Sequence, residues 1–355
     1  MKRFLKEWTP NSIPPFIAKV IYYEYWPFWL LYLPTLFYWF YLSIKARSFV
    51  YFISANPGID NGGAFGTSKD KILSKIDAQY LPHSLFVDIN AGYSSMQDKF
   101  IESKILFPVI CKPDEGEMGF RVSRIFSFNE LENYFDSSPC NFIIQEYINY
   151  PEELGVLFYR YPSGKTGITS VTRKKFLSVK GNGFSPVYVL LKEQTRGRMQ
   201  IDRIIKERPS LANSIPENNT TLLVEPIGNH CKGTEFINAC DLINPTLVNV
   251  FDKITKPIEG FYYGRFDLKV KSIEDLYRGE NIKILELNGV NCEPAHIYSH
   301  DMNLIRVYKT LFYNMKVVFE IAMENKSRGI EAPSFYSVYK KVRQHFKLRK
   351  KQVSN

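Results

Sequence analysis

Four polar residues on two neighbouring apolar stretches have the types and spacing for phosphate and metal chemistry. The stretches FYYGRFDLKV and IKILELNGV flank the loop KSIEDLYRGEN, so we expect an antiparallel hairpin. Side chains two positions apart on a strand point to the same face, so Arg265 shares a face with Asp267, as Glu286 does with Asn288. Two carboxylates and an amide oxygen suit Mg²⁺, and a guanidinium can neutralise a transferring phosphoryl group. The alternative is an exposed polar face that carries a surface ion pair.

A second group of residues suits a chain of phosphates. The stretch FPVICKPDEGEMGFRV places Lys112 at the end of an apolar strand, before a loop that contains Gly116 and Gly119. The backbone N–H groups of such a loop can close over phosphates, while the ammonium group supplies a point charge. Taken alone, the loop could equally be an ordinary turn.

The stretch IIQEYINYPEE has the pattern of a hinge that contacts a nucleoside. Gln145 and Glu146 follow two apolar residues, and Glu153 comes seven residues after Glu146. Alternating side-chain and backbone polar groups there could read an adenine edge, with a carboxylate for the ribose hydroxyls. For any one of these residues alone, a cap or a solvated charge is the simpler interpretation.

In this order the motifs resemble the ATP-grasp superfamily of carboxylate–amine ligases. The likeness is to D-alanine–D-alanine ligases in motif order, and to the ATP-grasp part of cyanophycin synthetases in the stretch VKGNGFSPVYVLLKEQTR. It covers roughly residues 107–300, and its most specific part is the RFD…LELN pair, with 18 residues between Asp267 and Glu286. Asn182 and the pair Ser185–Pro186 depart from the cyanophycin-type pattern, so substrate identity does not carry over.

The resemblance implies ATP as the nucleotide and Mg²⁺, or Mn²⁺ in its place, as the metal. Arg265 would stabilise the acyl-phosphate step, and Lys174 would be a second phosphate lysine, with Lys175 and Arg173 as competing choices. One or two metal ions would be held by the three oxygen donors of the hairpin, Asp267, Glu286 and Asn288.

The resemblance also implies contacts to the nucleotide and to the substrates. The nucleotide contacts would be Lys112, Glu115, Gly116 and Gly119 at the phosphates, and Gln145, Glu146, Ile148 and Glu153 at adenine and ribose. The loops GNHCKGTEF and GVNCEPAHIY would add contacts from Asn229, His230, Thr234, Asn291 and His296. His230 is a candidate acid, base or ligand, although a histidine satisfied by backbone contacts is the alternative for it and for His296.

The implied reaction joins an acid to an amine. A substrate carboxylate attacks the γ-phosphate to give an acyl phosphate, and an amine then displaces phosphate. No side-chain nucleophile is needed, in agreement with the lack of a Ser/His/Asp or Cys/His signature. The alternative is a catalytically degenerate, ATP-binding scaffold or sensor at a membrane, and the complete four-residue set on the hairpin favours the enzyme.

The elements that position these residues indicate the α+β class, and the resemblance implies an ATP-grasp fold of two α+β subdomains at 107–330. Before it, residues 48–106 suggest a small α/β unit. It would contain a strand SFVYFISA, a glycine-rich turn, a helix from Lys71 to Gln79 capped by Thr67 or Ser68, a strand LPHSLFVDI and a helix SSMQDKFIESKI. The glycine-rich turn either binds an anion or merely needs glycines. A core-facing helix is expected over 301–325.

The N-terminal segment 1–47 has the composition of a membrane contact. All four tryptophans lie within it, and 19 uncharged residues follow one another over 26–44. Nine of these are aromatic, Pro27 and Pro34 interrupt the run, and basic residues lie on both sides of it. We therefore expect a segment that lies in or dips into one leaflet rather than a simple crossing. The alternative is that the run packs on the protein itself.

The distribution of charge supports the same expectation. The chain has a net charge of +10, of which +4 lies in 1–47, +7 lies in 332–355 and −1 remains for the middle. The basic tail 331–355 could rest on an anionic membrane surface, whereas the near-neutral middle disfavours a nucleic-acid partner. Five cysteines without a C-x-x-C pair exclude a disulfide scaffold. We expect a cytoplasmic protein held peripherally or monotopically at a membrane, of unknown oligomeric state.

Overall fold

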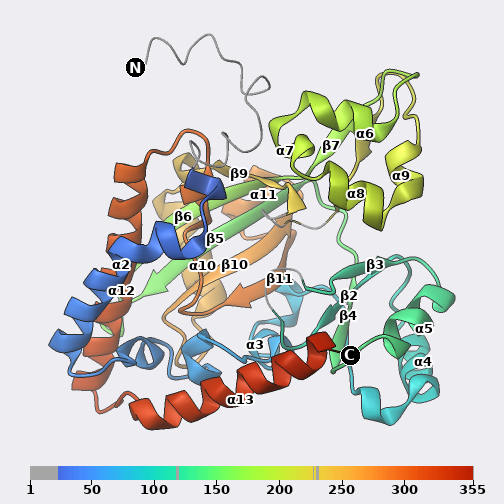
Figure 1. Ribbon diagram of the computed structural model, residues 1–355. Helices are drawn as coiled ribbons and strands as arrows, with labels where there is room; N and C mark the ends of the chain where they lie inside the picture. Colours follow the sequence, from blue (N-terminus) through green and yellow to red (C-terminus); the bar gives the residue numbers. More distant parts are fainter. Residues whose placement is uncertain (1–22, 117–119, 227, 229–231, 355) are drawn as a thin grey trace, which may run out of the picture. The chain divides into compact units, whose positions relative to one another are not determined.

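The computed structural model describes residues 23–116, 120–226, 228 and 232–354, with side chains as far as Phe346 (Figure 1). The chain forms two compact units. Among the described residues, the larger unit contains those of 35–173, 238–297 and 301–354, and the smaller unit contains those of 23–34, 174–237 and 298–300. The chain passes from one unit to the other within α2 (Phe28–Ala46), β6 (Thr166–Lys175), β9 (Glu235–Asn238) and η11 (Ala295–Tyr298), and returns to the larger unit after His300.

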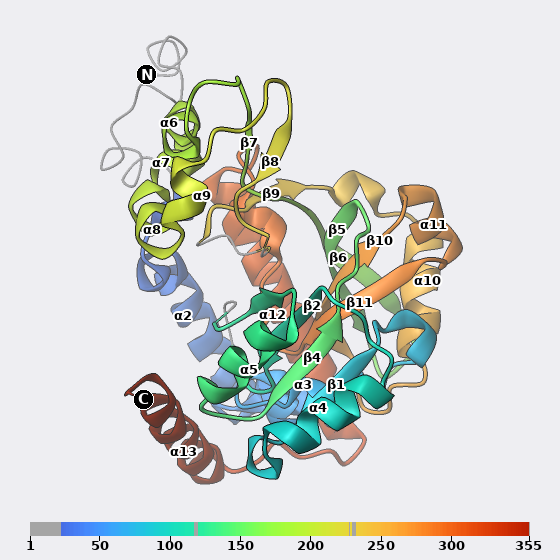
Figure 2. The same ribbon diagram turned by 90° about the vertical axis from the view of Figure 1, so that its right-hand side faces the viewer.

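The larger unit contains a four-stranded antiparallel sheet in the order β1-β4-β2-β3. Its side chains alternate, so that Val109, Cys111 and Ile144 pack in one core with the helices α4 and α5 (Figure 2). The opposite face therefore carries Lys112 and Gln145. The elements are β1 (Ser84–Val87), α4 (Tyr93–Glu102), β2 (Val109–Pro113), β3 (Ser123–Ile125), α5 (Phe128–Asp136) and β4 (Phe142–Glu146).

A five-stranded sheet follows in the order β11-β10-β5-β6-β9. One face packs on α10 and α11 through apolar residues such as Val156, Phe251 and Phe266, which are fully buried. The alternation of the strands places Arg265, Asp267 and Lys269 on the other face. The elements are β5 (Glu152–Arg160), α10 (Pro245–Thr255), β10 (Tyr263–Val270), α11 (Ile273–Arg278) and β11 (Ile282–Asn288), with β6 and β9 as given above.

Helices α2 and α12 pack together in a second core. Leu42 and Ala46 of α2 contact the buried stripe of α12 (Leu304–Ser327), and the rings of Tyr38 and Phe312 lie 5.0 Å apart. The helix expected over 301–325 is thus confirmed, with Val307, Leu311, Val318 and Ala322 buried. Among the described residues, no helix is both long enough and apolar enough to cross a membrane.

The stretch SFVYFISA, which we expected as a strand, forms the 3-10 helix η4 (Tyr51–Ala55) instead. The polar and aromatic groups of this segment make contacts with α12 rather than with a neighbouring strand. The Nδ2 of Asn325 donates to the carbonyl of Ser54 at 2.8 Å, and the ring of Tyr51 packs edge-on against Phe319 at 5.6 Å. The apolar residues on both sides of this segment reflect burial on all sides, which the alternating pattern alone does not distinguish from a strand.

Ser68 caps α3 (Lys69–Leu73), because its hydroxyl accepts from the backbone N–H of Lys71 at 3.2 Å. This helix is shorter than the expected one, since the chain turns again at η6 (Ala78–Tyr80). Strand β1 pairs with β4, so the segment before residue 107 contributes a strand to the sheet that follows it. The remaining single turns and the last helix are η3 (Tyr23–Tyr25), η5 (Asp60–Gly63), η7 (Ile89–Ala91), η10 (Cys240–Leu242) and α13 (Phe335–Ser354).

The smaller unit has its own core of apolar side chains around Leu177, Leu191 and Val224. Within it, the fully buried carboxylate of Glu225 lies 3.1 Å from Arg203 and 3.4 Å from Arg208. Its elements are β7 (Ser178–Lys180), α6 (Val187–Leu190), η8 (Leu191–Glu193), α7 (Thr195–Arg198), α8 (Ile201–Glu207), α9 (Pro209–Asn213) and β8 (Thr221–Leu223).

Candidate functional site

The hairpin expected from the sequence is confirmed as β10 and β11 of the five-stranded sheet. Its register sets Arg265 directly opposite Asn288 and Asp267 directly opposite Glu286. The guanidinium of Arg265 donates to both oxygens of Asp267, from Nε at 3.0 Å and from Nη2 at 3.2 Å. The four polar residues therefore lie in two adjacent cross-strand pairs.

The guanidinium of Arg265 is fixed by a third contact and by its charged surroundings. Its Nη1 donates to the carbonyl of Glu293 at 3.1 Å. Burial lowers the pKa of Arg265, but Asp267, Cys292 and Glu286 oppose that effect and the pKa is raised above its ordinary value. Gly155 on β5 leaves room for the pair, because a Cβ there would lie 3.2 Å from Asp267 Oδ1.

Lys112 is buried beside the same hairpin, although it comes from the four-stranded sheet. Its ammonium group donates to Gln145 Oε1 at 3.1 Å and to the carbonyl of Leu285 at 2.8 Å. Burial lowers the pKa of Lys112 to about 8, helped by Lys69, while Glu286 and Asp267 act in the opposite direction. A buried lysine so poised gains strongly from a nearby anion.

A second lysine, which the sequence did not indicate as a site residue, lies at this place. Lys69, in the first turn of α3, lies 3.7 Å from Glu286 Oε1 and also donates to the carbonyl of Gly116. Asp114 fixes the start of this helix, since its Oδ1 accepts from Ser68 Oγ and from the backbone N–H of Asp70, both at 3.0 Å. Lys69 thereby links the loop after β2 to the hairpin carboxylate.

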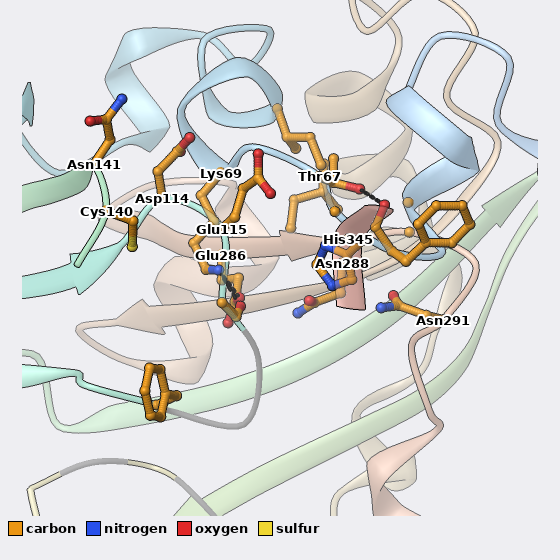
Figure 3. A pocket seen from close by; sticks show the side chains of 18 of the residues that line it. Thr67, Lys69, Asp114, Glu115, Cys140, Asn141, Glu286, Asn288, Asn291 and His345 are labelled. Carbon is orange, nitrogen blue, oxygen red and sulfur yellow. Dashed lines mark hydrogen bonds and ion pairs between the residues drawn. The ribbon is translucent and has the colours of Figure 1, made fainter. Parts of the chain in front are cut away.

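A pocket of about 430 Å³ opens over these groups within the larger unit (Figure 3). Five of the residues expected from the sequence line it, namely Glu115, Gly116, Glu286, Asn288 and Asn291. Lys112, Arg265 and Asp267 are outside its lining and lie next to it, through the contacts to Leu285 and the pairing with β11. The pocket also exposes side chains that the sequence did not indicate as site residues, among them Thr67, Lys69, Asp114, Asn141 and His345.

The glycine-rich turn forms one wall of the pocket by packing directly on the end of β11. The backbone N–H of Val290 donates to the carbonyl of Gly62 at 3.1 Å, and Asn56 Nδ2 donates to the same carbonyl at 3.2 Å. Gly63 has φ +79°, and a Cβ on it would lie 2.6 Å from the Cα of Gly289. These glycines are therefore needed for close approach of two backbones, whatever else the turn does.

Gly63→Ala is expected to lower the free energy of unfolding by about 3 kcal/mol, because it adds backbone strain and a clash with Gly289. Gly164→Ala is the matched control, since Gly164 has φ +102° with nothing within 4 Å of its Cβ position. That variant should lose only about 1 kcal/mol. Urea denaturation measures both values, and equal losses would contradict the close packing of the turn.

His345 enters the pocket from α13, in the basic tail. Val338 and Val342, which precede it on the same face of the helix, pack with Val50 and Ile53. The Nδ1 of His345 lies 3.1 Å from the Cβ position that Gly66 leaves empty. The basic charge of this tail predicts a surface strip, and only the helical spacing of Val338, Val342 and His345 could have indicated an inward face.

The residues expected at adenine and ribose are described but do not line this pocket. Gln145 contacts Lys112, and Glu146 accepts from the backbone N–H of His83 at 3.2 Å. The carbonyl of Ile148 accepts from Lys269 at 3.0 Å, and the same ammonium lies 3.9 Å from Glu153. Within the described part of the chain, the Nε2 of Gln145 is buried without a hydrogen-bond partner. A buried donor of this kind is expected where a bound ligand supplies the acceptor.

The other expected residues lie in different parts of the structure. Asn291 lines the pocket, whereas Thr234 is buried in the smaller unit. His296 is a buried structural residue, since its Nδ1 lies 2.6 Å from Ser170 Oγ and burial lowers its pKa to about 4. Lys174 lies at the start of the smaller unit, and Gly119, Asn229 and His230 lie outside the described residues.

Lys175 and Arg173, the alternatives to Lys174 for binding phosphate, each have an ion-pair partner. Arg173 lies 2.8 Å from Glu152, within the larger unit, and Lys175 lies 3.5 Å from Glu235, within the smaller unit. Cys292 is better described as a buried thiol than as a thiolate, because burial raises its pKa to about 12.

The donor set of the hairpin fits a hard divalent cation. Among the described residues, no group of three His, Cys, Asp or Glu side chains could hold a metal ion. The hairpin set differs from such a group, because it combines two carboxylates with the amide oxygen of Asn288, and Mg²⁺ commonly takes one or two carboxylates plus phosphates and water. Asp267 and Glu286 face each other in register, so both can reach one ion.

No family model matches the chain, and neither does any curated protein. Among solved structures, the chain is similar to VanG D-Ala:D-Ser ligase from Enterococcus faecalis, with 13% identity over 75% of this chain and 64% of that one, at a TM-score of 0.42. It is also similar to D-alanine–D-alanine ligase from Bacillus anthracis, with 15% identity over 74% and 68% of the two chains and a TM-score of 0.38. The chain is similar as well to a bifunctional glutathione synthetase from Pasteurella multocida, with 15% identity over 72% of this chain and 38% of that one, at a TM-score of 0.34.

The match takes in less than two thirds of the VanG ligase. The motif order and the strand orders of the two sheets are in keeping with the ATP-grasp fold expected from the sequence. At these identities and TM-scores the likeness carries no argument about this chain. Site residues, substrates and activity rest on the side chains of this chain.

Proposed function

We propose that the chain is an ATP- and Mg²⁺-dependent ligase that activates a substrate carboxylate for attack by an amine. The observation that carries this proposal is the pairing of Arg265 with Asn288 and of Asp267 with Glu286 beside the buried Lys112. Positively charged side chains and hard oxygen donors therefore lie together next to a pocket. A triphosphate and its metal ion require both kinds of group.

Lys112 and Lys69 are the residues we assign to the phosphates. Lys112 holds its proton only weakly, so a phosphate oxygen in place of the Leu285 carbonyl would raise its pKa and bind tightly. Lys69 bridges Glu286 and the carbonyl of Gly116, so its ammonium group can bind a phosphate that enters the pocket. The unpartnered Nε2 of Gln145 would find an acceptor on the nucleotide.

Asp267, Glu286 and Asn288 would hold Mg²⁺, which supplies neutralisation of the charge on the β- and γ-phosphates when bound. Arg265 then has two duties. It orients Asp267 through two hydrogen bonds, and its remaining N–H groups can stabilise the oxygens of the transferring phosphoryl group.

The reaction has two steps that balance without a protein nucleophile. A carboxylate oxygen of the acid attacks the γ-phosphorus, the bond to the β-phosphate oxygen breaks, and ADP leaves. The amine then attacks the acyl carbon, phosphate leaves with the bonding electrons, and the amine gives up a proton. Asn291 and His345 line the pocket beside Asn288 and are the groups we assign to the acid or the amine.

The purified full chain with ATP and Mg²⁺ should form ADP when a suitable acid is offered with hydroxylamine, which traps an acyl phosphate as a hydroxamate. Pools of amino acids, short peptides and a membrane extract serve as acid donors. Hydroxamate formation in proportion to ADP is the expected result. ATP binding without any ADP formation from these pools would favour the scaffold or sensor instead.

We also propose that the reaction takes place in the cytoplasm at the face of a membrane, with small or membrane-linked substrates. The apolar N-terminal run and the basic tail support this location. Cell fractionation tests it, and recovery of the intact chain wholly in the soluble fraction would contradict it.

A further inference from the structure

Helix α2 has two apolar faces, of which the core uses only one. Leu42 and Ala46 pack against α12, as described above. The side chains on the other face are each more than half exposed and recur every three or four positions, which places them in one stripe: Leu36, Phe37, Phe40, Tyr41 and Ile44.

Phe49 and the start of α13 continue this stripe. The ring of Phe49 lies 5.8 Å from the rings of Trp39 and Phe40, and 6.3 Å from that of Phe335. Tyr336 and Tyr339 are exposed beside Phe335, while Val338 of the same helix points into the core. We call the stripe of α2 together with Phe49, Phe335, Tyr336 and Tyr339 the aromatic surface.

Basic side chains border the aromatic surface. Lys45 lies 5.4 Å above the ring of Tyr41, and Lys340 and Arg343 are exposed on α13. The sequence after residue 331 contains seven basic residues and no acidic ones. Aromatic rings among lysines and arginines suit the interface between lipid headgroups and acyl chains, where ring and charge are both satisfied.

A hollow of about 310 Å³ lies between Phe49 and Phe335 within this surface. Arg47 and Lys326 line it, together with Glu331 as its acidic residue. The ammonium of Lys326 donates to the carbonyl of Ala46 at 3.2 Å, which leaves further protons for an anion. The hydroxyl-bearing residues Ser48 and Ser334 also line the hollow. A guanidinium, an ammonium and hydroxyls are the donors that bind a phosphate.

We infer that the aromatic surface docks on a bilayer that contains anionic lipids, with a headgroup phosphate in the hollow. Because one face of α2 packs on α12, the helix lies along the protein and presents only its outer stripe to lipid. A second copy of the chain is a poorer occupant, since it would bring like charges on α13 together. The inference rests on the membrane part of the proposed function and is independent of the reaction.

The test measures sedimentation of the full chain with vesicles of phosphatidylcholine alone and with added phosphatidylglycerol. We expect binding to the anionic vesicles that weakens with salt. Lys340→Gln with Arg343→Gln should weaken it more than tenfold, from about 1 kcal/mol per basic residue. Phe37→Ser with Tyr336→Ser should also weaken it at least tenfold, because both rings leave the interface.

The matched control substitutions are in α4 and in the segment after it, outside the aromatic surface. Lys99→Gln and Leu106→Ser change an exposed charge and an exposed apolar side chain there and should leave vesicle binding unchanged. Arg47→Gln should weaken binding to phosphatidylglycerol vesicles selectively. Circular dichroism and ATP turnover in solution should be unaltered in all variants, which separates failure of docking from failure of the ligase.

Equal binding of the surface variants and the intact chain would overturn the inference, and it would assign any membrane affinity to another part of the chain. Binding that does not distinguish anionic from neutral vesicles would overturn the headgroup site. Concentration-dependent dimers that disappear in Phe37→Ser with Tyr336→Ser, without vesicle binding, would identify a second copy as the occupant.

Discussion

Asp267→Asn is expected to lower ADP formation by roughly a hundredfold or more, with a marked rise in the Mg²⁺ concentration needed for half-maximal rate. The substitution keeps the size of the side chain and removes the charge. An amide cannot serve as an anionic metal ligand, and its Nδ2 would meet the guanidinium that now bonds both carboxylate oxygens. The measurement is the initial rate of ADP release against Mg²⁺ concentration.

Asp252→Asn is the matched control. Asp252 also pairs with an arginine of the five-stranded sheet, since its Oδ1 lies 2.8 Å from Arg160 Nη2, but on α10 and away from the pocket. It should alter stability while leaving the rate and the Mg²⁺ dependence within about twofold. A similar rate for Asp267→Asn and the intact chain would contradict the metal assignment.

Lys112→Met is expected to raise the KM for ATP roughly 10- to 100-fold, the effect of removing a hydrogen-bonded charge from a phosphate. The pH dependence should change with it. In the intact chain the free lysine loses its proton above about pH 8, so ATP affinity should fall as the pH rises through 8. ATP binding near pH 8 should therefore take up protons. Titration calorimetry in buffers of different ionisation enthalpy measures this uptake, which the methionine variant should lack.

The same variant should not be unfolded. The pKa of Lys112 in the fold lies below its ordinary value of 10.5, so the charged form is disfavoured there. This cost, about 3 kcal/mol, is fully present below pH 8 and disappears as the pH rises toward 10.5. Methionine removes it. Lys283→Met is the control, since Lys283 on β11 likewise donates to two carbonyls, of Gln79 and Leu81, outside the pocket. Undiminished ATP affinity in Lys112→Met would exclude this lysine from the phosphate site.

The strands and the hairpin could be predicted because their signals are local. The alternation around Asp267 and Glu286 specifies which face each residue occupies, and the connecting loop specifies the pairing. The buried stripe of α12 is local in the same way. By contrast, SFVYFISA has apolar residues on both sides, and only its contacts with α12 determine that it forms η4.

The residues of the site that sequence reasoning missed come from elements distant along the chain. Lys69 and Asp114 meet at the start of α3, and the sequence around either residue does not predict this contact. His345 lies in a tail whose charge suggested only a surface. Its place in the pocket follows from the packing of Val338 and Val342, a tertiary contact that charge pattern conceals.

The most direct test of the nucleotide and metal site is a crystal structure of the full chain with a non-hydrolysable ATP analogue and Mn²⁺, with anomalous scattering to locate the metal. We predict a metal peak about 2 Å from carboxylate oxygens of Asp267 and Glu286, with the γ-phosphate within hydrogen-bonding reach of Lys112 or Lys69. A nucleotide bound elsewhere, or a metal held by none of the hairpin residues, would contradict the assignment.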